Sequence, residues 1–344
     1  MNLDRVLDVV QRQSVDLPGG YAAIAVGRAD GPLASAAFLR GEPIDPPPRS
    51  PVASLTKPIT ATAIMQLVEA GAVDLDAPIA SYVPEFRPEP PAGERSVAPV
   101  TIRHMLSHTS GMSDLPDELL VTLPPTPAAM LDAMCAQRLT FAPGSAFQYA
   151  SEPWYLLSAI VERVASVPYP SFIRDRILAP LGMRLTTFDP RDAGADHLMP
   201  AGHFPSADLG ADDVLGLMAG LTMPGGSLWS TPGDILRFGR AMLLGGALDG
   251  ARILERRALG AMTEPQAAGV TDFGSGEPVH YGLGWGLRPA GASASAFAHS
   301  GATGSMLIVD PEADLVVVHL RNWWGVAMDA TTETVEAVYA SLDG

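Results

Sequence analysis

Residues 54–71 read SLTKPITATAIMQLVEAG and predict a buried helix that begins near Ser54 and ends at Gly71. Apolar residues recur at helical spacing between positions 59 and 68, and a glycine is a common residue just after a helix. Pro58 is tolerated only near a first helical turn, which independently places the start of the helix close to Ser54. Because Ser54 and Lys57 are three residues apart, we expect both side chains on one face of the helix.

Strands are predicted on both sides of this helix. Residues 21–28 and 33–39 flank the turn-forming sequence Ala-Asp-Gly-Pro at 29–32, a pattern that predicts an antiparallel hairpin. Further strands are predicted at 281–287, 306–309 and 315–320. The last two would pair across residues 310–314, and residues 328–342 would close the chain as an amphipathic helix.

The order of these elements predicts a mixed α/β (α+β) fold. Strands from the two ends of the chain would form one antiparallel sheet flanked by helices, and residues 1–74 and 225–344 would make up that domain. Residues 75–224 read as helices separated by proline-rich loops, and we interpret them as an inserted helical lobe. We expect the functional site at the interface of the two parts.

Composition narrows the classes of partner. The 344 residues carry 22 basic and 38 acidic side chains, a net charge of −16, which disfavours nucleic acid and anionic membrane surfaces as partners. No apolar run approaches the roughly 18 residues of a membrane span, and the N-terminus resembles a surface helix more than a signal peptide. We therefore expect a cytoplasmic protein. Its single cysteine, Cys135, cannot form an intrachain disulfide and is interpreted as a buried small residue.

Lys57 is the only lysine among the 22 basic residues. Arginine stays protonated in proteins, whereas a desolvated lysine can lose its proton and act as a base. A serine hydroxyl becomes a useful nucleophile when a neighbouring base takes its proton. The dipole at the start of the helix is expected to lower the pKa of Lys57. Ser54 and Lys57 are therefore candidate catalytic residues.

Other catalytic patterns are missing from the sequence. No serine has glycine two residues before and two residues after it, and neither HExxH nor a phosphate-binding GxxxxGK occurs. His104 and His108 have a spacing that could bind metal, but no carboxylate ligand is evident, so structural roles are favoured. We expect no metal and no cofactor.

Three short motifs carry a family resemblance: Ser54-Leu55-Thr56-Lys57, Tyr149-Ala150-Ser151 and His299-Ser300-Gly301. Their order and separation resemble the serine β-lactamase and penicillin-binding superfamily, and phrases at 106–111, 225–231, 281–285 and 310–312 are similar to its class C branch. The resemblance spans about residues 20–325. It implies a β-lactamase-like fold and a hydrolase that forms an acyl-enzyme on its serine.

The resemblance also implies roles for single residues. Ser54 would attack a carbonyl, while Lys57 and Tyr149 would share the proton transfers. Tyr149 is expected to be partly ionised beside a lysine ammonium. The backbone N–H groups of Ser54 and Ala302 would form the oxyanion hole. The residues expected to contact substrate are Ser151, His299, Gly301, Tyr281 and Trp285, with the two last aromatic residues lining an acyl pocket.

Two positions depart from the β-lactamase pattern and bear on the substrate. Ser151 stands where these enzymes carry Asn, and His299 stands where they carry Lys. A neutral imidazole would not pair with a carboxylate, so strong recognition of an anionic substrate is not expected. An imidazole here resembles the superfamily's carboxylesterases and D-aminopeptidase-like hydrolases. We favour small or medium acyl esters as substrates. The alternatives are a β-lactamase or D-amino-acid amidase or peptidase, an acyltransferase, and a catalytically silent binding protein; the oligomeric state is open.

Overall fold

A seven-stranded antiparallel sheet organises the computed structural model, which describes residues 3–17, 19–116, 126–192, 196–198, 201–202, 211–324 and 328–342. The strand order is β3-β2-β1-β12-β11-β10-β9. The bounds are β1 Tyr21–Gly27, β2 Pro32–Leu39, β3 Glu42–Pro43, β9 Gly286–Leu287, β10 Phe297–Gly301, β11 Ser305–Asp310 and β12 Leu315–Arg321. The predicted fold class is confirmed, since strands from the two ends of the chain share this one sheet.

The sheet joins the two ends of the chain through β1 and β12. These central strands pair antiparallel from Ala22 opposite Arg321 to Gly27 opposite Val316. The predicted hairpin is present as β1 and β2, and β11 pairs with β12 as expected. Both faces of the central strands are buried, so their sequences are continuous apolar runs rather than alternating ones.

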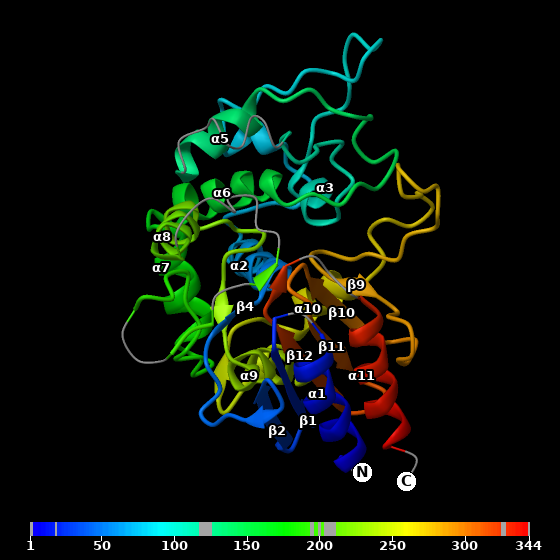
Figure 1. The fold of residues 1–344 in the computed structure, drawn as a ribbon. Coiled ribbons are helices and arrows are strands. Elements are labelled where there is room, and N and C mark those ends of the chain that lie inside the picture. The colour runs from blue at the N-terminus through cyan, green and yellow to red at the C-terminus, as the bar shows by residue number, and fades with distance from the viewer. Residues whose placement is uncertain are drawn as a thin grey trace.

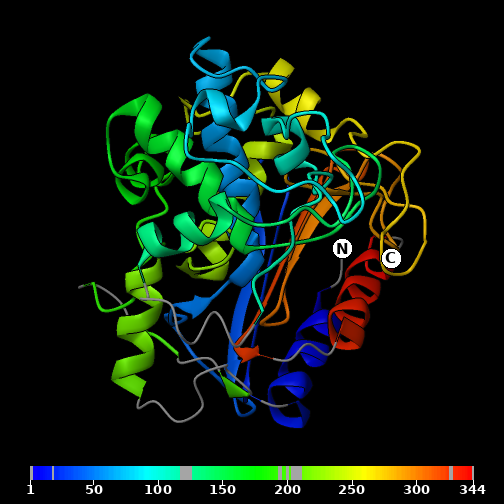
Figure 2. The same cartoon turned by 90° about the horizontal axis from the view of Figure 1, so that it is seen from above.

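Helices cover both faces of the sheet (Figures 1 and 2). Alternate residues of β1 belong to two different cores. Ala22, Ile24 and Val26 pack with α1 (Asp4–Asp16) and α11 (Met328–Ala340), the first and last helices. Residues 21, 23 and 25 belong to the larger core. That core includes α2 (Thr56–Glu69) and α9 (Pro232–Leu243), which is capped by Thr231.

Most remaining helices lie between α2 and α9 in the chain. Thr101 caps α3, because its hydroxyl accepts the N–H of His104. The helices and helical turns are η1 Ala53–Leu55, η2 Ile79–Ser81, α3 Ile102–Leu106, α5 Pro127–Cys135, η3 Glu152–Trp154, α6 Tyr155–Ala165, α7 Tyr169–Ile173, η4 Arg174–Leu178, α8 Ala211–Leu221 and α10 Arg256–Thr263. The division into a sheet domain and a helical lobe stays a prediction.

The predicted strand at 281–287 is mostly a turn. Only β9 at its end is a strand, and Tyr281 pairs with Gly286 through an isolated bridge. Gly284 has φ +75°, and a Cβ atom there would lie 2.6 Å from the Ala61 side chain, so the backbone bends closely over α2. Short two-residue strands complete the structure: β4 Ser50–Pro51, β5 Ala201–Gly202, β6 Trp229–Ser230, β7 Ala247–Leu248, β8 Ala251–Arg252 and β13 Trp323–Trp324.

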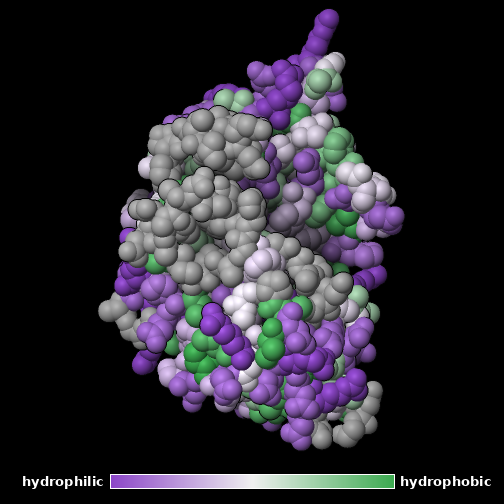
Figure 3. Space-filling view, viewed as in Figure 1, coloured by the Kyte–Doolittle hydropathy of each residue, from purple (hydrophilic) through white to green (hydrophobic). Residues whose placement is uncertain are grey.

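The surface shown in Figure 3 carries hydrophilic side chains over most of its coloured area, and hydrophobic ones form separate patches. Among the described residues, no helix combines the length and the apolar character needed to cross a membrane.

Candidate active site

Ser54 lies in the 3-10 turn η1, directly before α2. The preceding residue, Ala53, has φ +46°, a left-handed conformation that residues other than glycine rarely adopt. The Thr56 hydroxyl donates to the Ala53 carbonyl at 2.7 Å and accepts the N–H of Leu228 at 3.2 Å. Tertiary contacts therefore stabilise a strained turn at the candidate nucleophile.

The Lys57 amine reaches Ser54 as predicted. Its Nζ atom lies 3.3 Å from the Ser54 Oγ atom, 2.9 Å from the Ser151 Oγ atom and 2.9 Å from the Gly225 carbonyl oxygen. A neutral amine has two N–H groups and one lone pair. The two N–H groups can donate to Ser151 and Gly225, which leaves the lone pair for the hydroxyl proton of Ser54.

Burial is the largest cause that lowers the pKa of Lys57. The side chain is fully buried, and this loss of hydration lowers the pKa to about 7. Negative charge on the neighbouring carboxyl pair, Asp114 and Glu152, acts in the opposite direction and limits the decrease. Within the described ranges, no carboxylate forms an ion pair with Lys57. The amine is therefore able to exist in both protonation states near neutral pH.

Two glycines allow backbone segments to approach this group closely. A Cβ atom at Gly225 would lie 2.8 Å from the Ser151 carbonyl oxygen and 3.2 Å from Lys57 Nζ. At Gly301, on β10, a Cβ atom would lie 2.5 Å from the Val52 carbonyl oxygen. A side chain at either position would push its segment away from the start of α2.

The close packing of Gly301 against the turn brings the end of β10 beside Ser54. Ala302 follows directly, so its N–H group and that of Ser54 belong to adjoining segments. Two backbone N–H groups near one nucleophile are what an oxyanion hole requires.

Tyr149 adjoins the same group. The expectation that it is partly ionised is wrong. Its ring lies 4.5 Å from Lys57 Nζ. Burial raises the pKa of its hydroxyl above the usual range, and interactions with Ser54 and Ser151 compensate only in part. Tyr149 is therefore protonated near neutral pH and can donate a proton. Although its hydroxyl lies in a buried environment, the residue as a whole is 40% exposed, so the site is open to solvent on its side.

His299 is buried and neutral. Its Nδ1–H group donates to the Ser300 carbonyl at 2.8 Å, so its Nε2 atom accepts from the Tyr281 hydroxyl at 3.1 Å. Burial lowers the pKa of His299 to about 3. Both nitrogens are occupied within the protein, and the imidazole provides no positive charge at neutral pH.

Trp285 is a core residue in the structure. Its ring is fully buried, stacks on Phe238 with 6.2 Å between centroids, and meets Phe297 edge-on at 5.0 Å. It packs in the larger hydrophobic core and is closed to a ligand. The turn conformation of residues 282–285 places it there.

The segment after α3 adds His108, which the sequence did not single out for this site. His108 is buried, has φ +58°, and its ring lies 4.5 Å from that of Tyr149 and 5.1 Å from that of Tyr281. Its Nδ1 atom accepts the N–H of Ala150 at 3.3 Å.

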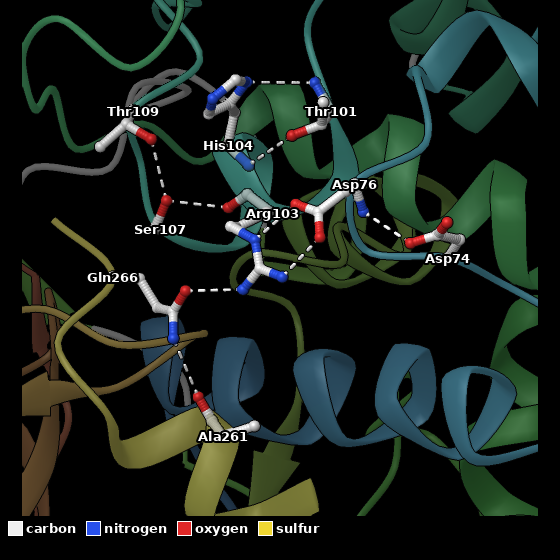
Figure 4. Close-up of polar contacts among 9 residues, drawn as sticks. All are labelled: Asp74, Asp76, Thr101, Arg103, His104, Ser107, Thr109, Ala261 and Gln266. Carbon is white, nitrogen blue, oxygen red and sulfur yellow. Dashed lines mark hydrogen bonds and ion pairs between the residues drawn. The ribbon is translucent and has the colours of Figure 1, made fainter.

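Figure 4 shows the contacts that support this segment. Arg103 forms a two-pronged ion pair with Asp76 at 2.7 and 2.8 Å, and Ser107 bonds to Thr109 at 2.9 Å. His104 forms a capping box with Thr101 through its Nδ1 atom. His104 and His108 thus use their Nδ1 atoms for different backbone groups.

Asp114 and Glu152 were also missed by sequence reasoning. The Asp114 Oδ1 atom accepts the N–H of Ser151 at 2.5 Å and that of Glu152 at 3.0 Å. No motif marks Asp114, because its relation to Ser151 depends on a contact between residues 37 positions apart. Glu152 directly follows the motif Tyr149-Ala150-Ser151. That adjacency was the only sequence signal that could have indicated a place for Glu152 near the site.

A cavity of about 540 Å³ lies elsewhere, lined by residues of α7, η4 and the 183–192 segment. None of the residues around Ser54 belongs to it. In the part of the chain that the structure describes, no group of three His, Cys, Asp or Glu residues could hold a metal ion.

The antiparallel sheet with helices on both faces, and a serine and a buried lysine where a helix begins, define the β-lactamase-fold class. Comparisons agree: residues 8–340 match the Beta-lactamase family model. The chain is 31% identical over 347 residues to penicillin-binding protein 4 of Amycolatopsis lactamdurans, covering 95% of this chain and 86% of that protein. The chain therefore belongs to the Beta-lactamase family, and the predicted resemblance is confirmed.

Two further relatives are informative. Esterase EstB of Burkholderia gladioli is 36% identical over 153 residues, covering 39% of this chain and 36% of that protein. The solved structure of EstCE1, described as a hydrolase with promiscuous acyltransferase activity, superposes with a TM-score of 0.80 at 21% identity, covering 97% of each chain. The likeness to EstCE1 concerns the fold alone.

Proposed function

We propose that this protein is a serine hydrolase that forms an acyl-enzyme on Ser54 and acts as a carboxylesterase on small or medium uncharged acyl esters. One observation carries the proposal: the buried Lys57 amine lies 3.3 Å from the Ser54 hydroxyl and has a pKa near neutrality. A neutral amine there is a base positioned to take the hydroxyl proton.

The first half of the reaction forms the acyl-enzyme. The Ser54 Oγ atom bonds to the carbonyl carbon as its proton passes to the Lys57 Nζ atom. The N–H groups of Ser54 and Ala302 donate to the resulting oxyanion. When the intermediate collapses, the bond to the alcohol breaks. The protonated Tyr149 gives its proton to the leaving oxygen and regains one from the Lys57 ammonium.

The second half hydrolyses the acyl-enzyme. A water molecule loses a proton to the Tyr149–Lys57 pair and attacks the acyl carbon. The bond between that carbon and Ser54 Oγ breaks, Oγ recovers a proton, and the carboxylic acid leaves. The exposure of Tyr149 supports entry of water from its side.

The charge around the site favours uncharged acyl groups. His299 is neutral and bonded to Tyr281 and to its own backbone, so no cation is available there for a substrate carboxylate. Ser151 has a shorter side chain than Asn and is already bonded to Lys57. Esterase EstB is among the relatives, which also supports ester substrates.

Covalent labelling with a fluorophosphonate tests the proposal. Intact mass measurement should show one adduct on the wild-type protein and none on Ser54→Ala. Ser145→Ala, which removes an exposed serine hydroxyl, should label normally and serves as a matched control. The wild type should release a burst of p-nitrophenol from p-nitrophenyl butyrate. A protein that neither labels nor turns over would be a binding protein.

Amide hydrolysis is the second candidate, because penicillin-binding protein 4 is a relative over nearly the whole chain. Hydrolysis of nitrocefin at a rate comparable to that of the ester would favour a β-lactamase or amidase. The description of EstCE1 suggests a third outcome. If added alcohol diverts the acyl group into a new ester, the protein is an acyltransferase.

A further inference from the structure

Asp114 and Glu152 form a pair of carboxyl groups beside Lys57. Asp114 lies in the loop after α3, whereas Glu152 begins η3, directly after Ser151. The Asp114 Oδ1 atom accepts the backbone N–H of Glu152 at 3.0 Å, so the two residues are direct neighbours. Among the described residues, neither forms an ion pair with an arginine or with Lys57.

The environment of Glu152 disfavours a second negative charge. The residue is only 8% exposed, and its Oε2 atom is buried without a hydrogen-bond partner in the described structure. An ionised oxygen in that position would lose its hydration without compensation. Burial, followed by the hydrogen bond and charge of Asp114, raises the pKa of Glu152 to about 9. Two neighbouring carboxyl groups of this kind retain one proton between them.

The Asp114 carboxylate is joined to the catalytic group through the backbone. Its Oδ1 atom accepts the N–H groups of Ser151 and Glu152, at 2.5 and 3.0 Å. The Ser151 hydroxyl in turn lies 2.9 Å from Lys57 Nζ. The carboxylate therefore fixes the backbone that carries one of the three partners of the amine.

We propose that Asp114 and Glu152 act as a positioning pair that shares one proton, orients Ser151 toward Lys57, and keeps a single negative charge beside the amine. This inference rests on the proposed function for its role in catalysis. The charge favours the ammonium form of Lys57 and so opposes the effect of burial. The other titratable groups that face Lys57 are neutral: His108 and His299 are buried imidazoles, and Tyr149 is protonated.

The sequence provides a direct probe, because Lys57 is the only lysine. Protein labelled with ¹³C-lysine gives one side-chain signal, whose chemical shift follows the protonation of this amine whether or not the enzyme turns over. The titration is compared in the wild type, Glu152→Gln, and the double variant Asp114→Asn with Glu152→Gln. Asn and Gln keep the shape of the carboxyl groups, and Asn keeps an oxygen that accepts the two backbone N–H groups.

Glu152→Gln should leave the Lys57 titration unchanged, because glutamine replaces a carboxyl group that is already neutral. The double variant removes the remaining charge and should shift the titration to lower pH by about one unit. The acid limb of the kcat/KM profile should shift in parallel. Asp132→Asn, which removes an exposed charge on α5, is the matched control and should shift neither.

A shift already present in Glu152→Gln would show that Glu152 is ionised and would overturn the shared proton. A double variant that titrates like the wild type would overturn the electrostatic role. Labelling of Ser54 by the fluorophosphonate tests the proposed function separately. If the protein fails to label but shows the predicted titrations, the inference about the carboxyl pair stands and the proposed hydrolase function is refuted.

Discussion

The Ser54 Oγ atom lies 3.3 Å from the Nζ atom of Lys57, and the amine that approaches this hydroxyl is fully buried. Ser54 is partly exposed. A partly exposed nucleophile beside a buried base suits catalysis, because burial lowers the pKa of the amine while the substrate still reaches the serine.

Replacing Lys57 with Arg should abolish turnover, because arginine cannot release its proton. Loss of a general base lowers rates by about 10²–10⁴-fold, and kcat for p-nitrophenyl butyrate should fall within or below that range. Circular dichroism reports whether the larger side chain is tolerated. Lys57→Met, which fills the site without a base, should show the same loss. Wild-type turnover in either folded variant would refute the assigned base.

The pH dependence of kcat/KM should show an acid limb with its midpoint at about 7, the lowered pKa of Lys57. The neutral amine is the active form, so activity should fall about tenfold for each pH unit below that value. The single ¹³C-lysine signal should titrate with the same midpoint. A lysine that stays charged up to about pH 10 would contradict the proposed base.

The lowered pKa of Lys57 also predicts how folding stability depends on pH. Between about pH 7 and 10, Lys57 is neutral when folded and protonated when unfolded, so the unfolded state binds one more proton. The free energy of unfolding should therefore rise with pH by about 1.4 kcal/mol per unit from this residue.

Urea unfolding of the wild type and Lys57→Met measures this contribution as a difference, because other groups titrate equally in both. Lys57→Met should lack the rise and should be the more stable protein at pH 7, where the wild type carries the cost of a buried amine. Parallel curves for the two proteins would mean that Lys57 keeps an ordinary pKa.

Gly225→Ala should lower kcat while the protein remains folded. The added Cβ atom would lie 2.8 Å from the Ser151 carbonyl oxygen and 3.2 Å from Lys57 Nζ, which displaces the Ser151 backbone and the amine itself. A misplacement of about 1 Å can cost 10²-fold in rate.

Gly260→Ala is the matched control for this variant. Gly260 lies within α10, and a Cβ atom there would meet no other atom within 4 Å. Its activity should equal that of the wild type, and stability should rise by up to about 1 kcal/mol. Equal activities for both alanine variants would show that close approach at Gly225 is not needed.

The sequence by itself determined the elements whose signals are local. The hairpin at residues 21–39 and the helix after Ser54 follow from turn chemistry, apolar spacing and proline placement. The single lysine also marked Lys57 as a chemical candidate. The roles of the predicted site residues and the cytoplasmic location stay predictions.

Only the tertiary structure decided the properties of the site that depend on distant contacts. Burial is the largest cause that lowers the pKa of Lys57, and it raises the pKa of Tyr149. A turn that periodicity could not reveal places Trp285 in the core. Asp114 approaches the site from 57 positions beyond Lys57, and Gly225 from 168 positions beyond it. Solvation and long-range proximity are properties of the folded chain, and no local pattern of residues encodes them.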